Sequence, residues 1–470
     1  MLHRIRQREL GITKPCSFQL LRCGTFQSEF EDLFRFEGGM AQEEFAVPYD
    51  VQFNKMPSSK RLCLVADEDG YVNIIDSSDR NIVWSQLIHN NAIYCAQWTN
   101  NDEAILTASG DKTCCITDIE TQTQLLACGH TGSVKCVSIH RDNHQIFASG
   151  SRDGNVCIWD TRRASHIPGS CLFPIGTLKL PHSTSKPSTP KRLRAGARKP
   201  FHTDPPKSVS AVVFLGDTNL LATSGASNGL VKIFDLRMFN ERNVIAQCRP
   251  QQNVGISSLN LDEGGSRSRL LVTCTNSARL IYGDCCEKGL NSQPIIISQK
   301  PYHCSFFVKS CFSPCGRYIL GGTPNGYLHI FDSQHPELAQ SLPDAGTGDI
   351  NGVAWDRYNP DQIVSCADNG DIRIWRYRRY DADIKIPNII NVQAISENIK
   401  EEAGSNDSVL GTSTMPTRQT TLDEAQIAIY PFSVSVPFAL MLDSIFSVRL
   451  LLEDWQHYLK SYVCLMARNI

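Results

Sequence analysis

The sequence of 470 residues lacks an apolar run long enough to cross a membrane, and it lacks a large excess of either charge. A spanning helix needs about 20 apolar residues. The best candidate, residues 427–442, is shorter and is interrupted by Pro431 and Pro437. The formal net charge of −2 argues against a protein coated in positive potential for nucleic acid, although it leaves room for a local basic patch. We therefore expect no membrane contact.

The chain also lacks any Cys-x-x-Cys pair, although it has 19 cysteines. Many of them, such as Cys63, Cys157 and Cys366, lie inside apolar runs. Buried thiols behave as small hydrophobic side chains. This pattern favours free thiols over disulfides or zinc ligands, and hence a reducing, intracellular compartment.

Signatures of catalysis are missing as well. The sequence has no glycine-rich phosphate loop after a strand, no His-Glu-x-x-His, no nucleophile elbow and no cluster with metal-ligand spacing. We therefore predict a protein that is not an enzyme, with no catalytic residues, no cofactor and no metal.

What the chain does have is a repeat of strand-like segments. Seven apolar runs are each preceded by Asp or Asn in a turn, and Gly follows in five of the seven turns. The turns are Asp69-Gly70, Asp111-Lys112, Asp153-Gly154, Asn228-Gly229, Asn276-Ser277, Asn325-Gly326 and Asn369-Gly370. They recur every 42 to 49 residues, with one gap of 75. Asx-Gly between apolar runs is a strong hairpin signal. The period predicts an all-β fold, a seven-bladed WD40-type β-propeller over residues 45–380.

The third repeat carries the most complete set of blade residues: His130, Ser149, Asp153 and Trp159. In such blades these side chains form a buried hydrogen-bonded network, and we interpret them as structural. His89 takes the equivalent place in the preceding repeat. The ring must close with an N-terminal strand, because an unpaired edge would otherwise remain. We expect residues 44–52 or their neighbourhood to supply it.

Outside the repeats the chain divides into four further segments. Residues 1–44 form an N-terminal extension, and residues 164–207 form a basic, flexible insertion between blades 3 and 4. The polar residues 381–424 are predicted to be a disordered linker. Residues 425–470 form an apolar tail. Two alternatives are open for it: a helix that docks onto another surface, or a variant C-terminal sequence that matches the rest of the chain poorly.

The insertion concentrates positive charge, because no Asp or Glu occurs between Thr161 and Thr203. Its basic residues include Lys186, Lys191, Arg192, Arg194, Arg198 and Lys199. This composition predicts a mobile loop that serves nuclear import or contacts phosphate backbones. The alternative is a solvated insertion without a partner. Thr189, followed by proline, is a candidate phosphorylation site.

Two repeats end in a way that the other five do not. Asp160 is followed two residues later by Arg162, and Asp235 by Arg237. Both arginines come just after the third strand of consecutive blades, so they should lie on one rim. A guanidinium positioned by its own carboxylate can bind carboxylates or carbonyls of a protein partner. The alternative is two surface arginines without a role.

These paired boxes resemble those of substrate receptors of cullin-4 RING ubiquitin ligases. More closely, the chain resembles the denticleless family. The residues that carry this resemblance are 64–72, 89–98, 108–113, 150–162, 257–262 and 307–314, and the basic insertion also lies in the family's place. The resemblance covers residues 45–380 and fails in the C-terminal tail. It implies that Asp160, Arg162, Asp235 and Arg237 dock onto the DNA-damage-binding protein 1 adaptor.

The resemblance further implies a nuclear, chromatin-associated protein. Such a receptor presents replication and cell-cycle proteins, bound to the sliding clamp PCNA, for ubiquitination during S phase and after DNA damage. Substrate should then bind on the face opposite the adaptor, where Arg152 and Lys112 are candidate contacts. The competing hypothesis is a chromatin- or histone-binding scaffold without a ligase role, whose basic loop contacts DNA.

Overall fold

The computed structural model describes residues 24–379. Within that range it leaves out residues 39–44, 59, 165–170, 184–207, 217, 239–242, 253, 263–268, 277, 284, 286–289, 291–292, 298–306, 335–337 and 344. The predicted linker, the apolar tail and the basic part of the insertion therefore lie outside the described residues. No helix in the described part of the chain is long and apolar enough to cross a membrane.

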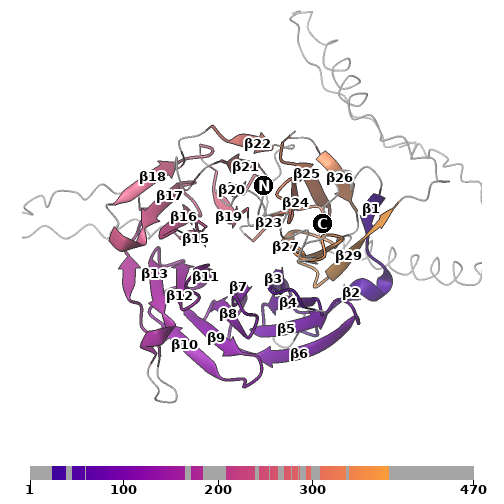
Figure 1. Ribbon diagram of the computed structural model, residues 1–470, viewed down its shortest axis with the longest axis horizontal. Coiled ribbons are helices and arrows are strands. Elements are labelled where there is room, and N and C mark those ends of the chain that lie inside the picture. Colours follow the sequence, from indigo (N-terminus) through magenta and orange to yellow (C-terminus); the bar gives the residue numbers. More distant parts are fainter. Residues whose placement is uncertain are drawn as a thin grey trace, which may run out of the picture. The chain divides into compact units, whose positions relative to one another are not determined.

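Seven antiparallel sheets are arranged in a ring, as Figure 1 shows, so the predicted all-β, seven-bladed propeller is confirmed. Blades 1 to 3 consist of β3 (Pro48–Phe53), β4 (Leu62–Asp67), β5 (Tyr71–Asp76) and β6 (Asn81–Leu87); β7 (Ile93–Trp98), β8 (Ala104–Ser109), β9 (Thr113–Asp118) and β10 (Gln124–Cys128); and β11 (Val134–Ile139), β12 (Ile146–Ser151), β13 (Val156–Asp160) and β14 (Gly176–Leu178).

Blades 4 to 6 consist of β15 (Val209–Phe214), β16 (Leu220–Gly225), β17 (Val231–Asp235) and β18 (Val244–Cys248); β19 (Ile256–Leu261), β20 (Leu270–Cys274), β21 (Arg279–Tyr282) and β22 (Ile295–Ile297); and β23 (Ser310–Phe312), β24 (Tyr318–Gly322), β25 (Leu328–Asp332) and β26 (Leu338–Leu342). Blade 7 consists of β27 (Ile350–Trp355), β28 (Gln362–Ala367) and β29 (Ile372–Arg379), completed by β1 (Gly24–Gln27) and β2 (Leu33–Phe34).

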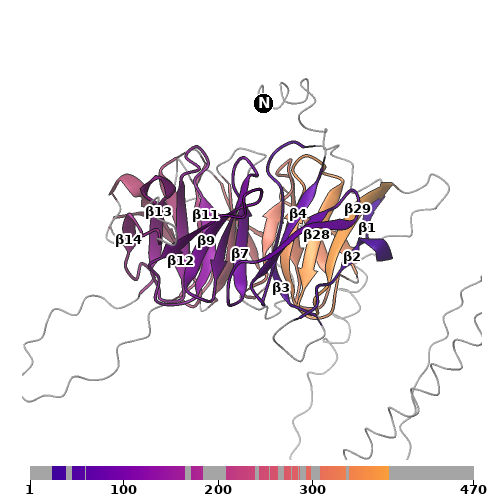
Figure 2. The ribbon, with the colours of Figure 1, turned by 90° about the horizontal axis from the view of Figure 1, so that it is seen from below.

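The Asx-Gly turns join the second and third strands of the blades, as their sequence predicts. Gly70 has a φ of +91°, and a Cβ placed there would lie 2.0 Å from the carbonyl oxygen of His89. Glycine adopts this left-handed region without a steric penalty. The turns therefore define one end of each blade, which we call the turn face. We call the opposite end, where Asp160 and Asp235 close the third strands of blades 3 and 4, the clamp face. Figure 2 shows the ring from the side, with the strands running between these two faces.

The ring closes through a segment earlier in the chain than we expected. Residues 44–52 do not supply the closing strand, because Pro48–Phe53 is the first strand of blade 1. Instead β1 and β2, from within the predicted N-terminal extension, both pair with β29. Phe26 anchors β1, with its buried ring in edge contact with Trp355 and Tyr377. The closing segment is set by these long-range contacts, which a period in the sequence does not report.

Charged side chains hold the same segment in place. The 3-10 turn η1 (Phe30–Asp32) presents acidic groups to Arg80 of blade 1. Asp32, which is fully buried, also accepts a hydrogen bond from Arg376 of blade 7 at 3.1 Å. Arg376 occupies the position where most other repeats carry Asp. In blade 7 the carboxylate thus comes from the closing segment instead.

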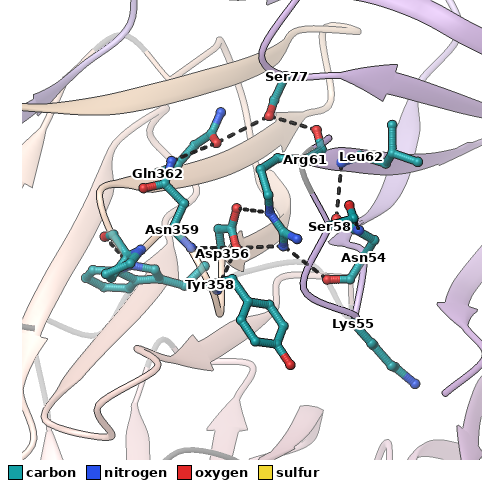
Figure 3. A network of polar contacts seen from close by, with 12 residues as sticks. Asn54, Lys55, Ser58, Arg61, Leu62, Ser77, Asp356, Tyr358, Asn359 and Gln362 are labelled. Atoms are coloured by element: carbon teal, nitrogen blue, oxygen red, sulfur yellow. Dashed lines mark hydrogen bonds and ion pairs between the residues drawn. The ribbon is translucent and has the colours of Figure 1, made fainter. Parts of the chain in front are cut away.

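The seam between blades 1 and 7 contains a buried polar network (Figure 3). Arg61 donates two hydrogen bonds of 2.7 Å to the two carboxylate oxygens of Asp356. Its guanidinium also donates to the carbonyl oxygen of Asn54, at 3.2 Å. Ser77 donates to the side chain of Gln362 across the same seam. Because Arg61 and Asp356 bond each other through both carboxylate oxygens, this ion pair can lie buried between two apolar sheets.

The insertion is shorter than the predicted 164–207. Gly176–Leu178 forms β14, the outer strand of blade 3, and His182 is fully buried. A short parallel bridge between Ala127 and Leu172 joins the segment before β14 to blade 2. Residues 171–183 therefore belong to the fold. The sequence did not predict this strand, because the stretch lacks the alternation of apolar and polar residues expected of a strand.

Candidate functional site

The blade network lies in the third sheet, where the sequence suggested a structural set of residues. Nδ1 of His130 lies 3.1 Å from Asp153, and Nε2 lies 2.7 Å from the hydroxyl of Ser149. The indole of Trp159 donates to the same hydroxyl at 2.8 Å. Burial works against the charged imidazolium, but the hydrogen bond with Asp153 raises the pKa of His130 to about 9. His130, Ser149 and Trp159 are all buried. Together with Asp153 they link the second and third strands to the turn face.

The network recurs in degraded form in neighbouring blades. His89 contacts Asp111 and Thr107, both at 2.8 Å. In blade 4 the counterpart is His182, whose Nε2 lies 2.9 Å from Thr223. Sequence reasoning missed His182, because residues 184–207 separate it from its partner strand. A histidine directly before the basic segment was the signal that could have found it.

Arg162 and Arg237 lie on the clamp face, each bound to the aspartate two residues before it. Arg162, in the 3-10 turn η2 (Thr161–Arg163), donates from Nε and Nη2 to the two oxygens of Asp160 at 2.8 and 2.6 Å. Arg237, in η3 (Leu236–Met238), donates to Asp235 at 3.1 and 2.7 Å. We call these two pairs the clamps. They have nearly the same geometry in two different blades.

The aspartate belongs to the fold, whereas the arginine is an addition. Asp160 and Asp235 accept the backbone N–H of residues 162 and 237. Asp76 and Asp332 accept the backbone N–H of Ser78 and Gln334 in the same way, without any arginine there. Aspartate favours such turns because its side chain satisfies the backbone two residues on. The third strand therefore ends properly without Arg162 or Arg237.

The clamps leave both guanidiniums available to a partner. The side chains of Arg162 and Arg237 are 60% and 73% exposed. A guanidinium has five N–H donors, and the bonds to its own aspartate use the edge formed by Nε and Nη2. The remaining N–H groups point away from that aspartate. Each clamp thus holds one edge of the arginine and presents the other.

Packing between blades 3 and 4 fixes where the clamps lie relative to each other. A core cluster joins the two blades, and Phe214, Phe234 and Ile146 pack in it. Leu236, next to Arg237, packs against the same cluster. Met238, on the other side of Arg237, is 64% exposed. The clamp face of these blades therefore carries two cations and an exposed apolar side chain, a mixture common at protein interfaces.

Electrostatics keep the clamps charged. The hydrogen bond from Arg162 lowers the pKa of the Asp160 carboxyl, and Arg237 does the same to Asp235. Each aspartate in turn raises the pKa of its arginine. Both pairs therefore stay ionised at neutral pH.

Groups suited to metal binding do not gather elsewhere in the described ranges. No cluster of three or more His, Cys, Asp or Glu there could hold a metal ion. The cysteines that the structure describes are free thiols, and Cys63, Cys157 and Cys366 are buried, as their apolar context suggested. Burial raises the pKa of Cys95 and Cys311 to about 12, so these thiols stay protonated.

The residues of the predicted basic loop lie outside the described residues. These are Lys186, Lys191, Arg192, Arg194, Arg198 and Lys199, together with the candidate phosphorylation site Thr189. Their roles in nuclear import or DNA contact remain predictions. Arg152 and Lys112 both lie in turns of the turn face, opposite the clamps.

Comparison with known proteins agrees with the fold and with the resemblance. The WD domain, G-beta repeat family model matches residues 82–118, 122–160 and 198–235. The chain is 28% identical over 345 residues to the denticleless protein homolog of Danio rerio, covering 71% of this chain and 52% of that protein.

Two further relatives are similar over the same share of the chain. The denticleless protein homolog of Homo sapiens is 26% identical over 351 residues, covering 71% of this chain and 47% of that protein. Protein lethal(2)denticleless of Drosophila melanogaster is 26% identical over 353 residues, covering 70% and 44%. The chain spans about half the length of the curated relatives it matches.

Proposed function

Starting from a WD-repeat propeller of the denticleless type, we propose that this chain is the substrate-recognition subunit of a cullin-4 RING ubiquitin ligase. The two clamps dock it to the DNA-damage-binding protein 1 adaptor. The observation that carries the proposal is the repetition of one exposed Asp–Arg geometry on neighbouring blades, at a position where the fold needs only the aspartate. In this role the chain performs no chemistry itself and works in the nucleus.

The opposite face of the ring then faces the substrate. Docking by the clamp face leaves the turn face uncovered, so a replication or cell-cycle protein held on PCNA could be presented there. A receptor needs these two separate faces, and the propeller supplies them at the two ends of the same strands. The positive insertion between blades 3 and 4 supports a nuclear, chromatin-associated location.

The test is a pull-down from nuclear extract with the full chain. The double variant Arg162→Ala with Arg237→Ala should lose adaptor co-purification, because removing a charged contact from an interface costs about 2–5 kcal/mol. Its thermal unfolding should match the native chain, since exposed ion pairs contribute about 0–1 kcal/mol. Arg163→Ala is the matched control, because Arg163 is exposed one residue away and has no such aspartate before it.

Unchanged adaptor recovery with the double variant would refute the proposal. The competing scaffold function makes the opposite prediction. It requires direct DNA binding that weakens steeply with salt and that is lost when Lys191, Arg192 and Arg194 are changed to alanine.

A further inference from the structure

Aromatic side chains from three distant parts of the sequence meet near the centre of the turn face. Tyr49 and Tyr94 are the second residues of the innermost strands of blades 1 and 2, and Phe307 precedes blade 6. Ring centroids lie 5.4 Å apart for Tyr49 and Tyr94, 4.8 Å for Tyr49 and Phe307, and 5.5 Å for Tyr94 and Phe307. We call these three residues the aromatic cage.

The cage already contains a cation from the chain itself. The ammonium of Lys135, the second residue of the innermost strand of blade 3, lies 3.2 Å from the centroid of Tyr94 and 5.0 Å from that of Phe307. Strand register places it on the turn face. Its neighbour Val134 pairs with Ser151 beside the turn, whereas Asp160 pairs with Ile146 at the opposite end of the sheet.

A second lysine beneath the cage is neutralised. The ammonium of Lys309 lies 2.7 Å from Asp50 and donates a hydrogen bond to the carbonyl oxygen of Tyr94 at 3.2 Å. This ion pair is an ordinary buried arrangement, because each charge has a partner. Lys135 differs from Lys309 in the lack of such a counter-charge among the described residues.

Lys135 and Arg152 have no such partner within the described ranges. No Asp or Glu oxygen there lies within ion-pair distance of either side chain. Burial and the nearby positive charge of Arg152 lower the pKa of Lys135 to about 8. The backbone N–H of Arg152 donates to the carbonyl oxygen of Ser133, two residues before Lys135, at 2.8 Å, so the two residues lie close together. The positive charge of Arg152 also works against the burial that raises the pKa of Tyr94. Two neighbouring cations, one of them half-buried, are costly unless an anion joins them.

The charges decide which ligand fits. An aromatic cage can bind an external cation, but here Lys135 already lies against the ring face and Arg152 would repel a second positive group. A carboxylate between Lys135 and Arg152 would instead relieve their repulsion. The rings of Tyr94 and Phe307 hold the Lys135 ammonium in place for such a carboxylate.

We propose that Lys135 and Arg152, at the edge of the aromatic cage, bind an acidic peptide segment, with a carboxylate on the two cations. The binding itself is independent of the ligase role. Only its use for substrate rests on the proposed function, because the cage lies on the face opposite the clamps.

The experiment is a selection of displayed random dodecapeptides on the full purified chain. Peptides that bind should be enriched in Asp and Glu. Synthetic versions with Asp and Glu changed to Asn and Gln should bind more than about tenfold more weakly, as should the parent peptides on the Lys135→Glu, Arg152→Glu variant. That charge-reversed variant should select basic peptides instead.

Two variants separate this proposal from the proposed function. The charge-reversed variant should still recover the adaptor, which shows that it is folded. The double clamp variant should still bind the acidic peptides. Enriched peptides without acidic residues, or acidic peptides that bind the charge-reversed variant equally well, would overturn the acidic-peptide site whatever the adaptor result.

Discussion

Arg61 and Asp356 are 295 positions apart, yet they form a bidentate ion pair at the seam where blade 1 meets blade 7. Their side chains are 8% and 0% exposed. A closed ring thus depends on a polar contact between its two ends as well as on strand pairing.

Asp356→Asn should lower the free energy of unfolding by about 3–5 kcal/mol, because it leaves the guanidinium of Arg61 buried without a counter-charge. Urea unfolding measures the loss. The control replaces both partners, Arg61→Met with Asp356→Leu, and should cost far less, since apolar groups then fill the seam. A single-variant loss no larger than that of a surface pair, about 1 kcal/mol, would contradict the importance of this contact.

Phe26→Ala should weaken the closure of the ring. Phe26 is 3% exposed and contacts Trp355 and Tyr377, and truncating a buried phenylalanine costs about 3–5 kcal/mol. Freed from β29, the closing segment should also become sensitive to limited proteolysis. Phe30→Ala is the matched control, because Phe30 is 89% exposed and should tolerate the change. Equal stability of the two variants would rule out β1 as the closing strand.

The His130 network should make stability depend on pH. The pKa of His130 is raised to about 9 in the folded chain, above its ordinary value near 6.5. Its stabilisation is therefore complete below about pH 6.5, declines as the pH rises, and is lost above about pH 9. The difference in unfolding free energy between the native chain and His130→Asn should shrink over this range.

The control for that measurement is His144→Asn, because His144 is exposed in a loop of the same blade. Its effect on the free energy of unfolding should be small. A gap between the native chain and His130→Asn that stays constant from pH 6 to pH 9.5 would show that the imidazole is neutral in the fold.

Gly70→Ala should destabilise blade 1 by about 1–3 kcal/mol, because its positive φ strains any residue with a Cβ. The added methyl would also meet the His89 carbonyl. Gly283→Ala is the control: a Cβ there meets no atom within 4 Å, so the change should stay within about 0.5 kcal/mol. Thermal unfolding of the two variants compares them directly, and similar melting temperatures would refute the strain.

The blades could be predicted because their signals are local. Asp153 and Gly154 form the turn that joins two adjacent strands, and the same pair of residue types recurs around the ring. The clamps are local too, since Arg162 contacts an aspartate two positions away. Contacts at such short spacing follow from the backbone conformation alone.

The closing segment and the strand β14 were not predictable in this way. Neither Gly24–Gln27 nor Gly176–Leu178 has an alternating apolar pattern of useful length, and each gains its place from the neighbouring strand. Arg376, in the place of the usual aspartate, was a hint that the last blade receives its carboxylate from elsewhere.

The sequence by itself determined the repeat, the turns and the two Asp–Arg pairs, because each is written within a few residues. Only the tertiary structure decided that Tyr49, Tyr94, Lys135 and Phe307 share one site. They come from blades 1, 2 and 3 and from the segment before blade 6, and they lie together because the ring brings the innermost strands to a common centre. The physical reason is ring closure, which depends on contacts such as Arg61 with Asp356 across nearly the whole length of the propeller.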